Sequence, residues 1–170
     1  NELLHVGRHV KVTGGGRVQS FSALTVVGNG RGTAGFGYGK GATVAIATRA
    51  ALRDAEKHAI SVPLLPSGRL VHGFRAAQDG THVILTLRRP GTGRRVGPFM
   101  SVLCDAVGLQ DVAVKTLGSR NVKNTVRAFF KGVFENATSA RLHAEKLGRR
   151  YVALDNVDVR RVAAAADAGG

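Results

Sequence analysis

The feature that most constrains this chain is the run GNGRGTAGFGYGKG at residues 28–41, in which seven of fourteen residues are glycine. From Gly35 to Lys40, glycine alternates with Phe, Tyr and Lys, so its glycines lie on one face of an extended strand. A face of glycine admits a close neighbour. The alternation alone leaves two equal candidates for that neighbour, a packed helix or an RNA backbone.

The same run comes close to two nucleotide-binding motifs. Gly30, Gly32 and Gly35 have GxGxxG spacing, but a dinucleotide fold needs a helix to begin at the third glycine, and here a strand pattern follows. A Walker A loop needs Ser or Thr where Gly41 stands. The sequence therefore predicts no nucleotide cofactor at this run.

The charge of the chain favours a polyanionic partner. Its 170 residues carry 25 Lys and Arg against 11 Asp and Glu, which gives a formal net charge of +14, and arginines outnumber lysines by 18 to 7. Arginine is the usual residue where a planar fork grips two phosphate oxygens or a base edge. No apolar run reaches the roughly 18 residues of a membrane span.

Residue types that could carry chemistry are few and scattered. The single cysteine, Cys104, lies in the apolar stretch FMSVLCDAV and is expected to be a core residue. His5 and His9 form a lone pair near one end and are expected at the surface, because a metal site needs a third ligand. We therefore expect no catalytic residue, no metal and no cofactor.

Hydrophobic periodicity predicts an α+β fold in two units, residues 1–59 and 60–147, followed by an extension over 148–170. The first unit is predicted to contain a helix over 42–59, with Val44, Ala47, Ala51 and Ala55 as its apolar side, and three strands: 8–13, 20–27 and 33–40. The second unit is predicted to contain helices over 98–107 and 122–137 and four strands: 60–65, 70–76, 81–88 and 111–117.

Cations recur at helical spacing and beside glycine turns. Arg49, Arg53 and Lys57 repeat at four-residue steps, as do Lys123, Arg127 and Lys131. One interpretation is that these cations lie on a solvent-exposed helix face. The other is that they bind an anion, which would replace their mutual repulsion by a favourable electrostatic interaction.

The basic loop RRPGTGRR at 88–95 is predicted to cradle phosphate. For Phe36 and Tyr38, buried packing is favoured over stacking on a base. The predicted RNA-binding residues are Lys11, Gly14, Gly15, Gly16, Arg17, Arg31, Lys40, Arg49, Arg53, Lys57, Arg94, Arg95, Arg120, Lys123 and Arg127.

Longer motifs resemble the universal S-five family of small-subunit ribosomal proteins. The run SFSALTVVGNGRGTAGFGYGKG, with VTGGGR upstream, resembles the family signature, and GTG at 91–93 and KTLGSRNVKNTVRAF at 115–129 are similar to its C-terminal motifs. The resemblance spans about residues 8–134.

The resemblance implies an N-terminal domain similar to double-stranded-RNA-binding modules, with a three-stranded antiparallel sheet and a helix. It implies a C-terminal two-layer domain of order β-β-β-α-β-α with a left-handed crossover. It also implies binding to small-subunit ribosomal RNA, with ribosomal proteins S-four and S-eight as neighbours. The implied location is near the messenger RNA entrance and the decoding region, in support of translation accuracy.

Several positions depart from the family pattern. Gly14 stands where lysine is usual, Thr33 where arginine is common and Val122 where proline is common, and residues 94–98 are basic where the family is apolar. With the asparagine at residue 1, which suggests a processed start, and the alanine-rich tail, these departures favour a mitochondrial ribosome over bacterial cytoplasm or a chloroplast.

Two other classes of protein stay open. A phosphotransferase is the enzyme alternative, since small-molecule kinases share the implied second fold, but their glycine-serine-rich loop is missing. A ribosome assembly factor or a free RNA-binding regulator would share every charge argument. The residues favour a ribosomal protein that is not an enzyme and has no membrane or small-molecule partner.

Overall fold

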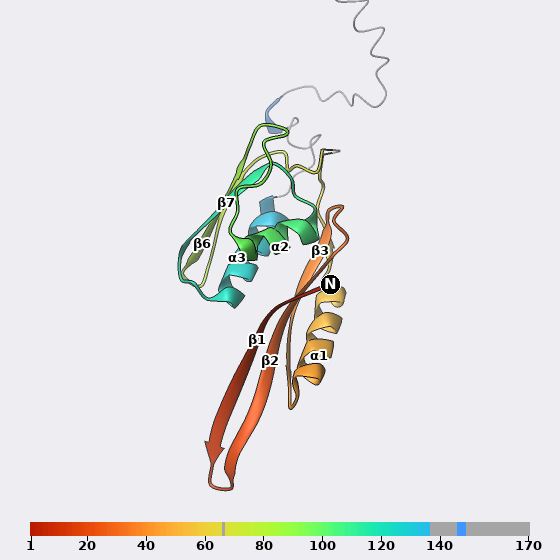
Figure 1. Cartoon of the computed structure of the whole chain (residues 1–170). Coiled ribbons are helices and arrows are strands. Elements are labelled where there is room, and N and C mark those ends of the chain that lie inside the picture. Colours follow the sequence, from red (N-terminus) through yellow and green to blue (C-terminus); the bar gives the residue numbers. More distant parts are fainter. Residues whose placement is uncertain (66, 137–145, 149–170) are drawn as a thin grey trace, which may run out of the picture. The chain divides into compact units, whose positions relative to one another are not determined.

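The computed structural model describes residues 1–65, 67–136 and 146–148, and Figure 1 shows two antiparallel sheets with their helices. Residues 1–138 form one unit in which both sheets lie. The predicted α+β class is confirmed. The predicted boundaries at 59/60 and 147/148 stay predictions, and the extension lies outside the described residues apart from Gly148.

The first sheet has the strand order β1-β2-β3-β4, with every neighbouring pair antiparallel. Its strands are β1 (Glu2–Thr13), β2 (Gly16–Gly28), β3 (Thr33–Gly41) and β4 (Ile60–Ser61). Helix α1 (Val44–Lys57) follows β3. Thr43 is its N-cap, and the side-chain oxygen of Thr43 accepts from the Ile46 N–H at 3.4 Å, which stabilises the start of the helix.

The close neighbour of the glycine face of β3 is α1. A Cβ atom added at Gly35, Gly37 or Gly39 would overlap a carbonyl oxygen of this helix. The three carbonyls belong to the buried alanines Ala55, Ala51 and Ala47. The two small-residue surfaces therefore bring two backbones into contact, and the alternative of an RNA backbone at this face is wrong. Val44, predicted to share this apolar side, is exposed.

The predicted strand over 60–65 differs from the structure in length and in place. Only Ile60 and Ser61 are extended, and they pair with β3 in the first sheet. Pro63 follows two residues later, and its missing N–H prevents a ladder from continuing. The first sheet therefore has four strands where three were predicted.

The second sheet has the order β5-β6-β7 and is also antiparallel. Its strands are β5 (Phe74–Gln78), β6 (Thr81–Leu87) and β7 (Val112–Gly118), accompanied by α2 (Pro98–Val107) and α3 (Val122–Asn136). One further residue, Arg95, makes a parallel bridge to Ala113 of β7. The left-handed crossover stays a prediction.

The face of the first sheet opposite α1 shares a core with α2 and α3. Phe36 of β3 stacks on Phe130 of α3, with ring centroids 5.1 Å apart and planes at 27°. Cys104 is fully buried in this core, as predicted, and burial raises the pKa of its thiol to about 12. No helix among the described residues is long and apolar enough to cross a membrane.

The loop 28–32, where nucleotide motifs nearly matched, closes the C-terminal end of α2. The N–H groups of Gly30 and Gly32 donate to the carbonyls of Ala106 and Val107, at 3.1 and 2.8 Å. These carbonyls belong to the last turn of α2, whose carbonyls have no partner inside the helix. The glycines here serve a helix end rather than a phosphate.

Candidate nucleic-acid interface

The predicted RNA-binding residues are all exposed except Lys123, which is half-buried. They belong to several separate elements of the fold. They occupy the turn between β1 and β2, one face of α1, the start of α3, and the basic loop before α2. Arg31 stands apart in the loop before β3, where its backbone N–H donates to the Asn29 side chain at 2.8 Å.

The β1–β2 turn presents bare backbone. A Cβ at Gly14 or Gly15 would meet nothing within 4 Å, and Gly16 has a φ of +124°, which favours glycine. Figure 1 shows that this end of the hairpin extends past α1. Because Lys11 pairs with Val18 while Arg17 pairs with Val12, the two cations lie on opposite faces of the hairpin. The turn can therefore meet a polyanion from either side.

Exposed valines accompany these cations, although the sequence pattern does not predict their exposure. The alternation around Val10 and Val12 is typical of a strand with one buried face. In the structure, however, Val12 is 73% exposed and Val18 is 58% exposed. No helix in the described part of the chain covers this half of the hairpin, and its valines are exposed.

The cation stripe of α1, formed by Arg49, Arg53 and Lys57, makes no ion pair with a carboxylate in the described parts of the chain. Asp54 of the same helix contacts Tyr38 and His58 rather than the stripe. Its carboxylate accepts from the Tyr38 N–H at 3.0 Å and lies 3.2 Å from His58 Nδ1. An external anion is therefore free to neutralise the stripe.

The backbone of the basic loop before α2 is hydrogen-bonded to a carboxylate of the protein itself, that of Asp111. The N–H groups of Gly91 and Gly93 donate to Asp111, at 3.0 and 2.7 Å. These hydrogen bonds, with Arg69 and Arg88 nearby, hold the pKa of Asp111 below its usual value. The backbone of the predicted phosphate cradle is thus already occupied.

The arginines of that loop also differ from one another. Arg94 forms an ion pair with Asp105 of α2. The backbone of Arg95 is fixed by β7, with its N–H donating to the Val112 carbonyl at 2.9 Å. Arg94 and Arg95 were both predicted to bind RNA. Of the two, only the Arg95 side chain forms no ion pair with an acidic residue in the described part of the chain.

At the start of α3, Lys123 and Lys40 meet over one aromatic ring. Their Nζ atoms lie 3.9 and 5.9 Å from the centroid of Tyr38. Tyr38 and Phe36 are both partly buried and pack against the shared core, as predicted. The pairing joins β3 to α3, and sequence spacing could not show it.

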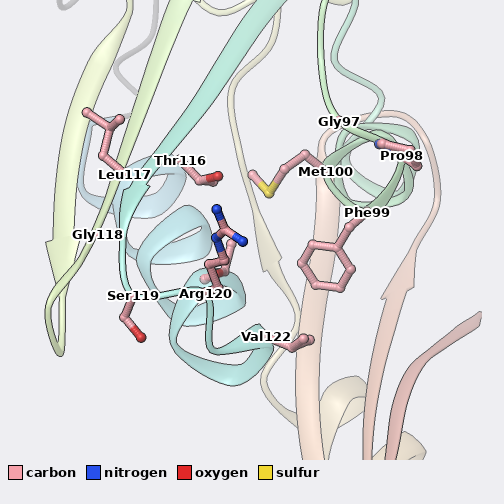
Figure 2. Close-up of a pocket in the computed structure, with 11 residues that line it drawn as sticks. Gly97, Pro98, Phe99, Met100, Thr116, Leu117, Gly118, Ser119, Arg120 and Val122 are labelled. Atoms are coloured by element: carbon pink, nitrogen blue, oxygen red, sulfur yellow. The ribbon is translucent and has the colours of Figure 1, made fainter.

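A hollow of about 570 Å³ lies between the first turn of α2 and the end of β7. Figure 2 shows the guanidinium of Arg120 directed into it, on the side of Thr116. Most of the remaining wall is apolar, from Phe99, Met100 and Leu117. Among the residues that the structure describes, no group of three or more His, Cys, Asp or Glu could hold a metal ion.

Comparison with known proteins gives two family matches along the chain. The model for ribosomal protein S5, N-terminal domain, matches residues 1–63, and the model for ribosomal protein S5, C-terminal domain, matches residues 76–146. These ranges contain the first sheet, the three helices and the second sheet except for the first two residues of β5.

Curated bacterial proteins are similar over most of the chain. The small ribosomal subunit protein uS5 of Buchnera aphidicola is 38% identical over 149 residues, which cover 88% of each chain. The uS5 proteins of Xanthomonas campestris and Stenotrophomonas maltophilia are 38% identical over 155 residues, covering 91% of this chain and 85% of theirs.

Proposed function

The chain belongs to the ribosomal protein S5 family, and from this premise we propose that it is a structural component of the small ribosomal subunit. It binds ribosomal RNA and catalyses no reaction. The observation that carries the proposal is the α1 stripe of three exposed cations without a carboxylate partner among the described residues. Such a stripe releases counterions when it meets phosphates.

The predicted residues would share this work unequally. Lys11, Arg17 and the backbone of Gly14–Gly16 would contact phosphates at the hairpin turn, and Arg49, Arg53 and Lys57 would do so along α1. Lys40, Lys123, Arg120 and Arg127 would act at the start of α3. Arg94 would contribute less than Arg95, because Asp105 already matches its charge.

Finer parts of the proposal rest on the resemblance to the family. They place the chain beside ribosomal proteins S-four and S-eight, near messenger RNA at its entrance and near the decoding region, where it would support translation accuracy. A mitochondrial ribosome is the proposed host, and the bacterial origin of the relatives supports bacterial cytoplasm as the alternative.

The test is the salt dependence of binding to intact small-subunit ribosomal RNA. The double variant Arg49→Ala/Arg53→Ala should flatten the slope of log K against log salt by about one unit per lost phosphate contact. The matched control is Arg75→Ala/Lys115→Ala, which removes two exposed cations of the second sheet. An unchanged slope in the α1 variant, or an equal change in the control, would remove α1 from the interface.

A second measurement separates a ribosomal component from an assembly factor. A structural component sediments with small subunits through a high-salt wash, whereas a transient factor is released. Release of the wild-type chain into the supernatant would therefore favour the assembly factor.

A further inference from the structure

A second hollow, of about 360 Å³, lies where β1, β2 and β3 meet the start of α3. We call it the histidine hollow. Its lining residues are His5, Gly7, His9, Ser22, Ala23, Leu24, Tyr38, Arg120, Asn121, Val122 and Lys123. It is within the roughly 300–1,000 Å³ of small-ligand sites, and it is large enough for more than a lone ion.

The strand period of β1 brings the two histidines to this hollow. His5, Gly7 and His9 alternate along β1 and so lie on one face, the face that carries Tyr38 on β3. A Cβ at Gly7 would lie 2.9 Å from the Ser22 hydroxyl oxygen and 3.3 Å from His9 Nε2. The missing side chain lets the His9 ring reach Ser22, to which Nε2 is hydrogen-bonded at 2.8 Å.

The charge around the histidine hollow is positive. Lys123 contributes a permanent charge from α3, and Lys40 lies over the same Tyr38 ring. Arg120 lies on the wall shared with the larger hollow of Figure 2.

The nearest described carboxylate is that of Asp54, which accepts from the Tyr38 N–H at 3.0 Å and belongs to α1, on the other face of the sheet. In β1, β2, β3 and α3 the only acidic residues are Glu2 and Glu135, near the outer ends of β1 and α3. Asp79 approaches α3 through its backbone carbonyl, which accepts from Asn124, and its carboxylate accepts from the Gln78 side chain. None of the described residues that line the hollow is acidic, so the hollow offers donors and cations to an anion.

We propose that the histidine hollow binds a phosphodiester group of RNA, with Lys123 as its permanent cation and His5 and His9 as imidazole donors. This deepens the proposed function, on which it rests, by naming a site that the arginine stripes do not include. The two histidines are the parts that a reading of charge alone overlooks, since imidazoles do not enter the formal charge.

The test uses the full chain and the single-stranded RNA hexauridylate as its probe. In ¹H–¹³C spectra of the histidine rings, signals of His5 and His9 should shift saturably with added RNA. The signal of His58, which lies beside Asp54 and outside the hollow, should not follow them. The variant Lys123→Ala should abolish the two shifts, and poly-glutamate of equal charge should produce none.

Affinity gives the second readout. His5→Ala/His9→Ala should weaken hexauridylate binding about tenfold, because two hydrogen bonds to an anion are lost, and His58→Ala should leave it unchanged. Equal shifts of all three histidines, or shifts caused by poly-glutamate and not by RNA, would overturn the proposal. If Arg49→Ala/Arg53→Ala changes the salt slope of ribosomal RNA binding but the histidine variants bind hexauridylate normally, the hollow is excluded and the proposed function stands. If the salt slope and the hexauridylate affinity are both unchanged, the hollow and the proposed function are both excluded.

Discussion

β3 and the β1–β2 turn are both rich in glycine, but their glycines meet different surroundings. The glycine face of β3 is filled by α1, so that a single added methyl group would overlap helix backbone. At Gly14 and Gly15 the same methyl group would meet nothing within 4 Å. One set of glycines is needed for packing, and the other leaves backbone open to a partner.

The difference teaches that glycine content by itself does not identify a phosphate site. The basic loop before α2 is an intermediate case. Its Gly91 and Gly93 have open space around their Cα atoms and positive φ angles of 77° and 75°, yet their N–H groups are engaged by Asp111. Space, backbone conformation and free donors must all be examined before a glycine loop is assigned to a ligand.

The largest effect is expected at the packed face. Gly37→Ala places a methyl group on the backbone of Ala51 and Ala55, so α1 must move away from β3, at a cost of about 3 kcal/mol in the free energy of unfolding. Urea denaturation measures this, and Gly97→Ala, at a glycine with no neighbour within 4 Å, is the control. Equal stability of the two variants would show that the β3–α1 contact is not tight.

A smaller loss is expected where the loop 28–32 meets α2. A Cβ at Gly28 would overlap the Ala106 carbonyl, but this contact lies at the end of β2, where the chain can shift. Gly28→Ala should cost about 2 kcal/mol. Hydrogen exchange should localise the loss to the Gly30 and Gly32 amides that donate to α2. Unchanged protection of these amides would contradict the role of the loop as a helix cap.

Local features of the fold could be predicted from the sequence because they depend on short periods. Alternation located β3, and four-residue spacing located both the buried alanines and the exposed cations of α1. The strand predicted over 60–65 was wrong because the apolar run outweighed Pro63 in that interpretation. The alternation also could not decide between helix and RNA, since it specifies a face and not its occupant.

Long-range pairings limited the prediction of the candidate site. Asp111 accepts a hydrogen bond from the N–H of Gly93, which is 18 residues away in sequence, and no local pattern predicts this contact. The contact of Lys123 with Tyr38 and the approach of His5 and His9 to α3 likewise depend on how separate segments fold together. The positions of cations could be predicted, but their protein partners could not.

The Asp111 contact predicts an acid-sensitive loop. The ionised Asp111 carboxylate is stabilised in the folded state, so its pKa lies below the ordinary 3.8. Its contribution to the free energy of unfolding is therefore complete above pH 3.8 and is lost as the pH falls through the lower pKa of the folded state. Asp111→Asn should lower stability at pH 7 by less than Gly37→Ala does. The difference between variant and wild type should shrink below pH 4. Urea midpoints at pH 7 and pH 3 measure both effects, and a constant difference would show that the charge is not involved.

The smallest effect on stability is expected at the open turn. Gly15→Ala adds a methyl group that meets nothing, at a residue outside the left-handed region, so the free energy of unfolding should change by no more than about 0.5 kcal/mol. Its affinity for small-subunit ribosomal RNA should nevertheless fall, because the methyl group obstructs close approach to the turn. Filter binding at fixed salt measures the affinity, and Gly97→Ala, which is equally open but lies at the start of α2, serves as the control. Wild-type affinity in Gly15→Ala would mean that RNA does not approach the turn closely, and the contrast with β3 would then rest on packing alone.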